Sequence, residues 1–222
     1  LGGSVPLNVS DGTLQFAVNA SGSSAESFGT LQAIHGYTNI VVETSGQRSA
    51  LTFSSLSGNA VNANATLLFR AAGTGANFGT AANTVGFTTA PTLSPNVAGG
   101  GILSRGLVVD GNGWNFATYY QGIQAFTAYD ATNLNAASAV ATSSTATVQV
   151  GSSVTLAGNR TINGIKLAGG DLALGGAGST LTLTSGGILA TGGTSTIASG
   201  VVVAAGATEV GLNAGADGVL NV

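Results

Sequence analysis

The sequence predicts an all-β protein whose short strands coil into a parallel β-solenoid. Apolar and polar residues alternate with a period of two, glycines interrupt this alternation every few residues, and no segment has a convincing amphipathic helical pattern. The stretch GSTLTLTSGGILATGGTSTIASGVVV, residues 178–203, shows the first two features together and has neither a charge nor an aromatic ring. Its repetition therefore indicates architecture and not a chemical site.

The alternation of period two begins near the N-terminus. In TLQFAV, residues 13–18, the Leu, Phe and Val side chains share one face of an expected strand. In ATLLFR, residues 65–70, Leu67 and Phe69 lie on one face, whereas Leu68 lies on the opposite face with polar neighbours. Both segments are typical of half-buried strands.

The C-terminal block repeats the pattern with smaller residues. Leu183 is expected to point inward and Thr182 outward, and Lys166 should point outward between Ile165 and Leu167. Strand starts recur about every eight to ten residues, near Ser153, Gly164, Asp171, Thr180, Gly187, Thr196, Val201 and Glu209. The Ala-rich residues 133–144 contain enough Asn, Ser and Thr to favour a loop or short turn over a helix.

A sandwich and a solenoid both fit such strands. A sandwich needs hairpins, and dipeptides typical of hairpin turns occur at Asp11-Gly12, Asp110-Gly111, Asn112-Gly113, Asn163-Gly164 and Asp217-Gly218. The Gly-Gly corners and the small Thr, Val, Leu and Ala strand residues favour the solenoid, because its narrow interior stacks like side chains turn upon turn.

The composition changes near residue 130. Residues 1–130 hold all thirteen aromatic residues and all three prolines, and residues 131–222 are regular and rich in glycine. We expect residues 1–130 to be a solenoid part with an aromatic-rich insertion or junction at about 99–130. Residues 131–222 should form a regular solenoid part, continuous with the first in one elongated domain.

The charge balance excludes several functions. Only 6% of the residues are charged and the net charge is −3, so the five scattered basic residues cannot neutralise a nucleic acid backbone. The chain contains no Cys, which excludes disulfides, thiol catalysis and Cys-based metal sites. It also lacks Met, and the absence of both oxidisable sulfur residues suits an extracellular location. No apolar run approaches the ~20 residues of a transmembrane helix.

Candidate catalytic groups are few and scattered. The eight carboxylates stand at irregular spacings, and His35 is the only histidine, with no Gly-x-Ser-x-Gly segment to present a nucleophile. His35 precedes Gly36 and is expected to occupy a turn. The DGNG segment, residues 110–113, is followed by Trp114 where a calcium loop needs an acidic or amide residue, and the Glu that the loop needs further on is missing, so DGNG is expected to be a tight turn. We therefore expect no enzymatic activity, no cofactor and no metal.

Residues 157–193, AGNRTINGIKLAGGDLALGGAGSTLTLTSGGILATGG, resemble the autotransporter-associated β-strand repeat proteins of bacteria, which are surface and secreted proteins. Residues 87–130 resemble the non-repeat segment that often separates such repeats. The resemblance implies a right-handed parallel β-helix exposed outside the cell, and it implies no catalytic residues.

Two functional hypotheses follow. Both ends of the chain read as further strand without a helical cap, so copies could stack head-to-tail into a fibre or surface layer. The expected assembly edges are Val5, Leu7, Val9, Val219, Leu220 and Val222. The alternative is the passenger or stalk segment of an adhesin in which Trp114, Tyr119 and Tyr120 bind glycan or a cell surface, unless these rings fill a local core.

Overall fold

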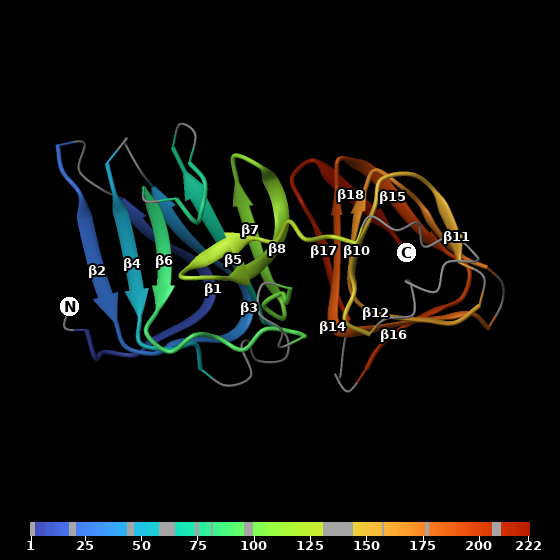
Figure 1. Cartoon of the computed structure of the whole chain (residues 1–222), viewed down its shortest axis with the longest axis horizontal. Coiled ribbons are helices and arrows are strands. Elements are labelled where there is room, and N and C mark those ends of the chain that lie inside the picture. Colours follow the sequence, from blue (N-terminus) through green and yellow to red (C-terminus); the bar gives the residue numbers. More distant parts are fainter. Residues whose placement is uncertain are drawn as a thin grey trace. The chain divides into compact units, whose positions relative to one another are not determined.

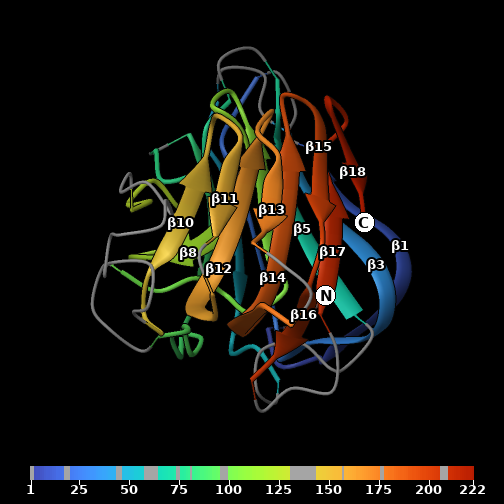
Figure 2. The same ribbon diagram turned by 90° about the vertical axis from the view of Figure 1, so that its right-hand side faces the viewer.

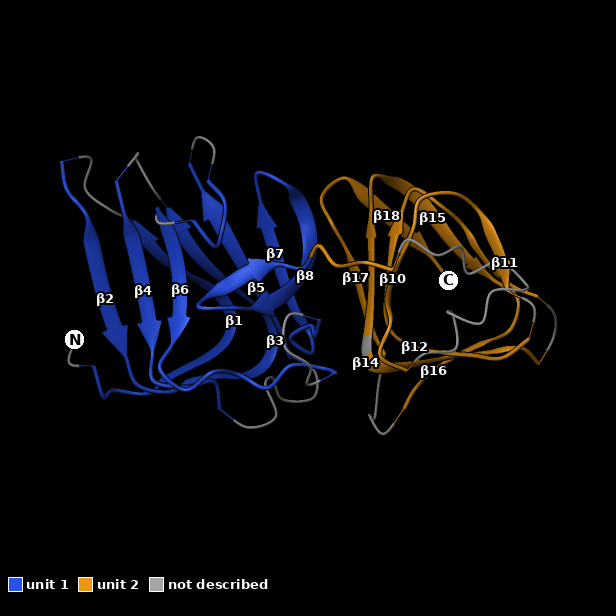
Figure 3. Cartoon of the chain, viewed as in Figure 1, with its two compact units in different colours: residues 1–126 blue, residues 127–222 orange. Residues whose placement is uncertain are grey.

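The computed structural model describes residues 3–17, 21–43, 47–57, 65–73, 76–80, 82–95, 100–130, 144–156, 158–175, 178–205 and 210–222. Within these residues all regular structure is β-strand, and the strands stack in parallel into a β-solenoid of about seven turns. The chain forms two compact units, Leu1–Phe126 and Thr127–Val222 (Figure 3). The expected all-β parallel solenoid is confirmed. Val18, Glu209 and nearly all of residues 133–144 lie outside the described residues.

Unit 1 begins with three turns, each made of two strands. The first strand of each turn pairs in parallel with the first strand of the next turn, and a fourth strand extends this sheet. Its strands are β1 (Leu7–Ala17), β3 (Leu31–Glu43), β5 (Ala65–Ala72) and β7 (Gly106–Asp110). The second strands form another parallel sheet: β2 (Ser24–Phe28), β4 (Ser49–Phe53) and β6 (Asn83–Phe87). Figure 1 shows β2, β4 and β6 side by side.

The core of unit 1 consists of side-chain columns that run through successive turns. Phe28, Phe53 and Phe87 occupy one register position, and their ring centroids are 5.9 and 5.7 Å apart. Such offset stacking adds to the free energy of burial. Leu68, expected on the solvent face, is instead buried together with its register partner Leu107. The expectation is wrong because both faces of β5 are covered at this position.

Antiparallel strands end unit 1. After β7 the chain reverses into β8 (Gly113–Tyr119) and then into β9 (Ile123–Ala125). The first reversal is a two-residue loop between Asp110 and Gly113, so the hairpin signal of DGNG is correct here. Asp11-Gly12 and Asn163-Gly164 lie within strands that keep parallel partners, and Asp217-Gly218 leads into a parallel strand, so none of these three dipeptides makes a hairpin.

Unit 2 forms four turns. One parallel sheet contains β10 (Thr147–Val150), β12 (Arg160–Ala168) and β14 (Thr180–Thr191), and β14 pairs with β16 (Val201–Ala204) along its first half and with β17 (Gly211–Ala214) along its second. The other sheet contains β11 (Val154–Leu156), β13 (Leu172–Leu174), β15 (Gly193–Ala198) and β18 (Gly218–Asn221). Figure 2 shows how the strands of successive turns lie beside one another.

The core of unit 2 is built of small aliphatic columns. Val148, Ile165, Ile188 and Leu212 share one register position, and the first three are buried. The expected orientations are confirmed in two places. Leu183 is fully buried and Thr182 is half-buried. Lys166 is half-buried between the fully buried Ile165 and Leu167.

Candidate functional site: the two end turns

The first turn of unit 1 has a free edge within the part of the chain that the structure describes. β1 pairs only with β3, and β2 pairs only with β4. A hollow of about 370 Å³ follows β1 from Leu7 to Leu14. Of the sequence-predicted edge residues, Leu7 and Val9 pack partly buried over Leu31 and Ala33, and Val5 is exposed just before the strand.

The last turn of unit 2 has a free edge of the same kind. Within the described chain β16 and β17 pair only with β14, and β18 pairs only with β15. Leu220 packs partly buried against the core, and Val219, which is 52% exposed, lies on the opposite face of β18. Val222 is 76% exposed and follows Leu220 by one period of the strand.

An apolar cavity of about 360 Å³ opens at this last turn. Its lining includes the buried core residues Leu174, Ile188 and Ile197, and its rim includes Leu212, which is 53% exposed, and Val222. Leu212 belongs to the inward column of Ile188, and within the described residues no strand pairs with the other side of β17. Leu212 was not among the edge residues predicted from the sequence, although the alternation in GLNA places it on the same face of the strand as Ala214. The interior of the solenoid thus reaches the surface here.

The three aromatic residues predicted to bind a surface do not form one platform. Trp114 is half-buried opposite Val109, and Tyr119 lies on the other face of β8 because five residues separate the two. The Tyr119 hydroxyl donates to the Phe87 carbonyl oxygen at 2.8 Å and accepts from the Phe87 N–H at 3.0 Å. Tyr119 therefore packs against the core of unit 1, next to the column of stacked phenylalanines. Tyr120 is 64% exposed.

Tyr120 stands beside a polar hollow of about 310 Å³. Uncharged groups line it, with hydroxyls from Thr80 and Thr84 and amides from Gln121 and Gln124. The Gln124 Nε2 donates to the Tyr120 carbonyl oxygen at 2.8 Å, which holds the hairpin loop. The hollow combines an aromatic ring with neutral hydrogen-bonding groups, a combination suited to polyhydroxylated ligands.

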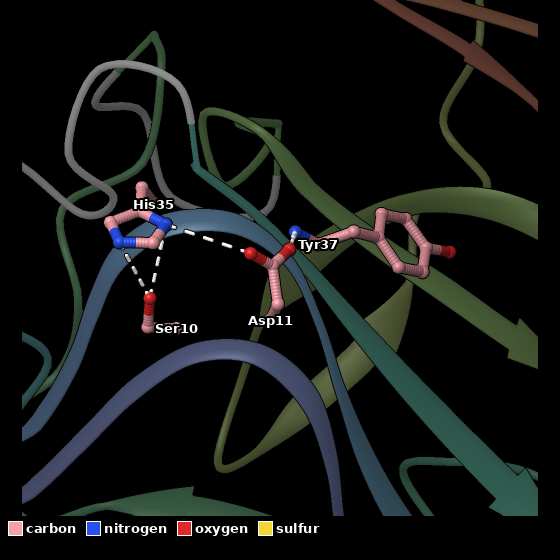
Figure 4. A network of polar contacts seen from close by, with 4 residues as sticks. All are labelled: Ser10, Asp11, His35 and Tyr37. Atoms are coloured by element: carbon pink, nitrogen blue, oxygen red, sulfur yellow. Dashed lines mark hydrogen bonds and ion pairs between the residues drawn. The ribbon is translucent and has the colours of Figure 1, made fainter.

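Ser10, Asp11 and His35 meet where β1 and β3 bend (Figure 4). Ser10 Oγ lies 3.0 Å from Nδ1 and 2.8 Å from Nε2 of His35, and Asp11 Oδ2 lies 3.6 Å from Nδ1. Asp11 Oδ1 accepts a hydrogen bond from the Tyr37 N–H at 2.9 Å. Gly36 has a φ of +73°, and a Cβ there would overlap the Asp11 carboxylate. The expected turn position of His35 is wrong, because His35 lies within β3 beside Ser10, where the positive φ of Gly36 bends the strand without ending it. Its two partners could not be foreseen from the sequence.

This cluster has the residue types of a catalytic triad but not the arrangement of one. A triad places serine at one ring nitrogen and a buried carboxylate at the other. Here the serine oxygen is almost equally near both nitrogens, and the histidine and aspartate are exposed. Two register shifts interrupt β1 between Val9 and Gly12. The contacts therefore fasten an irregular bend of β1 onto β3.

The pKa values of Tyr37 and Lys166 are shifted, both chiefly through burial. Burial raises the pKa of the Tyr37 hydroxyl, and the charge of Arg70 partly offsets this. Burial lowers the pKa of the Lys166 ammonium, and the charge of Asp217 partly offsets that. Lys166 Nζ lies 5.3 Å from the centroid of the Tyr129 ring, a cation–π contact.

Among the described residues no three His, Cys, Asp or Glu side chains gather into a group able to hold a metal ion. The same part of the chain has no helix with the length and hydropathy to cross a membrane.

No protein-family model, curated protein or solved structure matches this chain. The assignment of a β-solenoid therefore rests on the strand register itself.

Proposed function

We propose that this chain is a structural subunit of an extracellular bacterial fibre or surface layer. Copies assemble head-to-tail, the last turn of unit 2 in one copy pairing with the first turn of unit 1 in the next. The observation that carries the proposal is the last turn of unit 2, where Leu212 and Val222 expose the inner columns beside strands that have one unpaired edge within the described chain.

The first turn supplies a matching surface. Its inward side chains on β1 are apolar, Leu7, Val9, Leu14 and Phe16, and they are only partly buried. A docked turn would bury them at about 25 cal/mol per Å² and would satisfy the free backbone groups of both edges. The contact joins two different surfaces, so it is heterologous and open-ended, which generates filaments.

Composition and resemblance support the extracellular setting. The chain has few charges and no oxidisable sulfur residue. Residues 157–193 resemble the autotransporter-associated β-strand repeats of bacterial surface proteins. The right-handed coil implied by that resemblance is part of this proposal.

The test compares two aspartate variants of the last turn. Leu212 and Val219 are almost equally exposed, but Leu212 belongs to an inward column and Val219 faces outward. We expect Leu212→Asp to abolish filaments in negative-stain microscopy and Val219→Asp to retain them. Dispersed wild-type monomers at high concentration would refute the proposal, and so would equal loss of assembly in both variants.

The hollow at Tyr120 favours a second candidate function, a passenger or stalk segment of an adhesin that binds neutral glycans. Its support is the exposed ring next to four uncharged polar side chains. Binding on a glycan array should be lost in Tyr120→Ala and retained in Trp114→Ala, because Trp114 is not among the lining residues. An array with no signal for the wild type would eliminate this candidate.

A further inference from the structure

Glu26 occupies an inward position of the first turn. In the register of β2, β4 and β6, Glu26 stands over Leu51 and Val85 with no register shift. Leu51 and Val85 are fully buried members of the core, and the neighbouring inward column contains the three stacked phenylalanines. The carboxylate is exposed, since within the described chain β2 has no strand on its other side.

A turn docked on this edge would cover the Glu26 carboxylate. Removing an ionised carboxylate from water is unfavourable unless a cation or hydrogen-bond donors replace the water. Among the described residues, the inward positions of the last turn of unit 2 carry aliphatic side chains, Val202, Ala204, Leu212, Ala214, Leu220 and Val222. A second copy of this chain therefore brings no inward cation to Glu26.

The two halves of the first turn thus differ as an interaction surface. In the β1 half the inward side chains are apolar. In the β2 half the Glu26 carboxylate occupies the inward position that continues the apolar column of Leu51. Inward-pointing charges on edge strands are a known means of discouraging edge-to-edge association. The β2 half weakens the same contact that the β1 half favours.

We infer that Glu26 is a gatekeeper of the first turn, which weakens stacking of a second copy on this edge and keeps assembly reversible. The inference rests on the proposed head-to-tail assembly. Neutralising the carboxylate should strengthen stacking, and placing an apolar side chain there should strengthen it further, because the column would then continue from one copy to the next.

The experiment measures the critical concentration for assembly by light scattering and sedimentation in wild type, Glu26→Gln and Glu26→Leu. Ser27→Leu is the matched control, because Ser27 lies on the outward face of the same strand over Thr52. We expect Glu26→Leu to lower the critical concentration by about tenfold or more, equivalent to about 1.4 kcal/mol or more per contact. Glu26→Gln should be intermediate, and Ser27→Leu should match wild type.

The outcomes separate this inference from the proposed function. If wild type assembles and Glu26→Leu has the same critical concentration, the gatekeeper role is wrong and head-to-tail assembly stands. An equal decrease in Glu26→Leu and Ser27→Leu also overturns it, because general hydrophobicity then explains the effect. If no variant assembles at any concentration, both ideas fail. Assembly of Glu26→Leu should be lost on adding Leu212→Asp, and its persistence would show a different interface.

Discussion

The hydroxyl of Tyr119 satisfies both backbone polar groups of Phe87, donating to its carbonyl oxygen and accepting from its N–H, while the two rings lie 5.8 Å apart. Phe87 belongs to β6, the last strand of its sheet, so the free edge of that strand is occupied at this residue by a side chain. The antiparallel hairpin therefore closes one end of the core of unit 1, in contrast to the open first turn.

Removing the Tyr119 hydroxyl should destabilise unit 1. Tyr119→Phe keeps the ring but leaves the Phe87 N–H and carbonyl without this partner, at a cost of about 1–3 kcal/mol. Tyr120→Phe is the control, because Tyr120 is exposed, and it should change the stability by less than about 0.5 kcal/mol. Urea unfolding followed by circular dichroism checks both values, and equal stability of the two variants would contradict the role of Tyr119.

Aspartate at an inward position of unit 2 should prevent folding, whereas aspartate at the adjacent outward position should be tolerated. Leu183 is fully buried between Ile162 and Ala204, so Leu183→Asp places a carboxylate in the core at a cost of more than about 4 kcal/mol. Thr182→Asp should cost about 0.5–1 kcal/mol because Thr182 is only half-buried. Thermal melts with equal losses would show that the inside and outside of β14 are assigned incorrectly.

The bend at Gly36 should reject any side chain. Gly36→Ala meets both a φ of +73° and the Asp11 carboxylate, so we expect a loss of more than about 1 kcal/mol. Gly151→Ala has open space around its new Cβ and should be nearly neutral. Adding Asp11→Ala to Gly36→Ala should recover part of the loss in denaturant unfolding, whereas strictly additive losses would mean that the two residues do not clash.

Stability should fall at alkaline pH partly through Tyr37. Burial raises the pKa of Tyr37 in the folded state, so the unfolded chain loses this proton first. The contribution of protonated Tyr37 to the free energy of unfolding is fully present below its pKa in the unfolded chain, about 10, and is lost as the pH rises through its higher pKa in the folded state. Tyr37→Phe should therefore lose less stability than wild type between neutral and alkaline pH. If denaturant titrations give the two proteins identical stability profiles against pH, Tyr37 is not a source of the alkaline loss of stability.

Much of the architecture could be predicted from residue patterns. The alternation around Leu183 and Lys166 correctly separated buried from outward positions, because a strand turns each successive side chain to the opposite face. The same logic was wrong for Leu68, since alternation says which residues share a face but not whether that face is covered. Of the five turn dipeptides, only the two in DGNG form a hairpin in the described chain, because turn dipeptides also suit bends within parallel strands.

The candidate site was only partly predictable. The end segments could be selected as strand-like, and Leu7, Val9 and Leu220 do pack against the cores of their units. The exposure of Leu212, the inward place of Glu26 and the partners of His35 depend on which residues lie one turn away. These neighbours are about 25 residues distant in the chain, and no local pattern specifies that register.

By itself, the sequence determined an all-β solenoid with small aliphatic columns and no disulfides, because strand periodicity and composition act within a few residues. The tertiary structure alone decided the register of the turns, and with it the closed end at Tyr119, the open end at Leu212 and the carboxylate in the first column at Glu26. Register is set by the sum of contacts between segments distant in the chain, whose relative placement no single segment encodes.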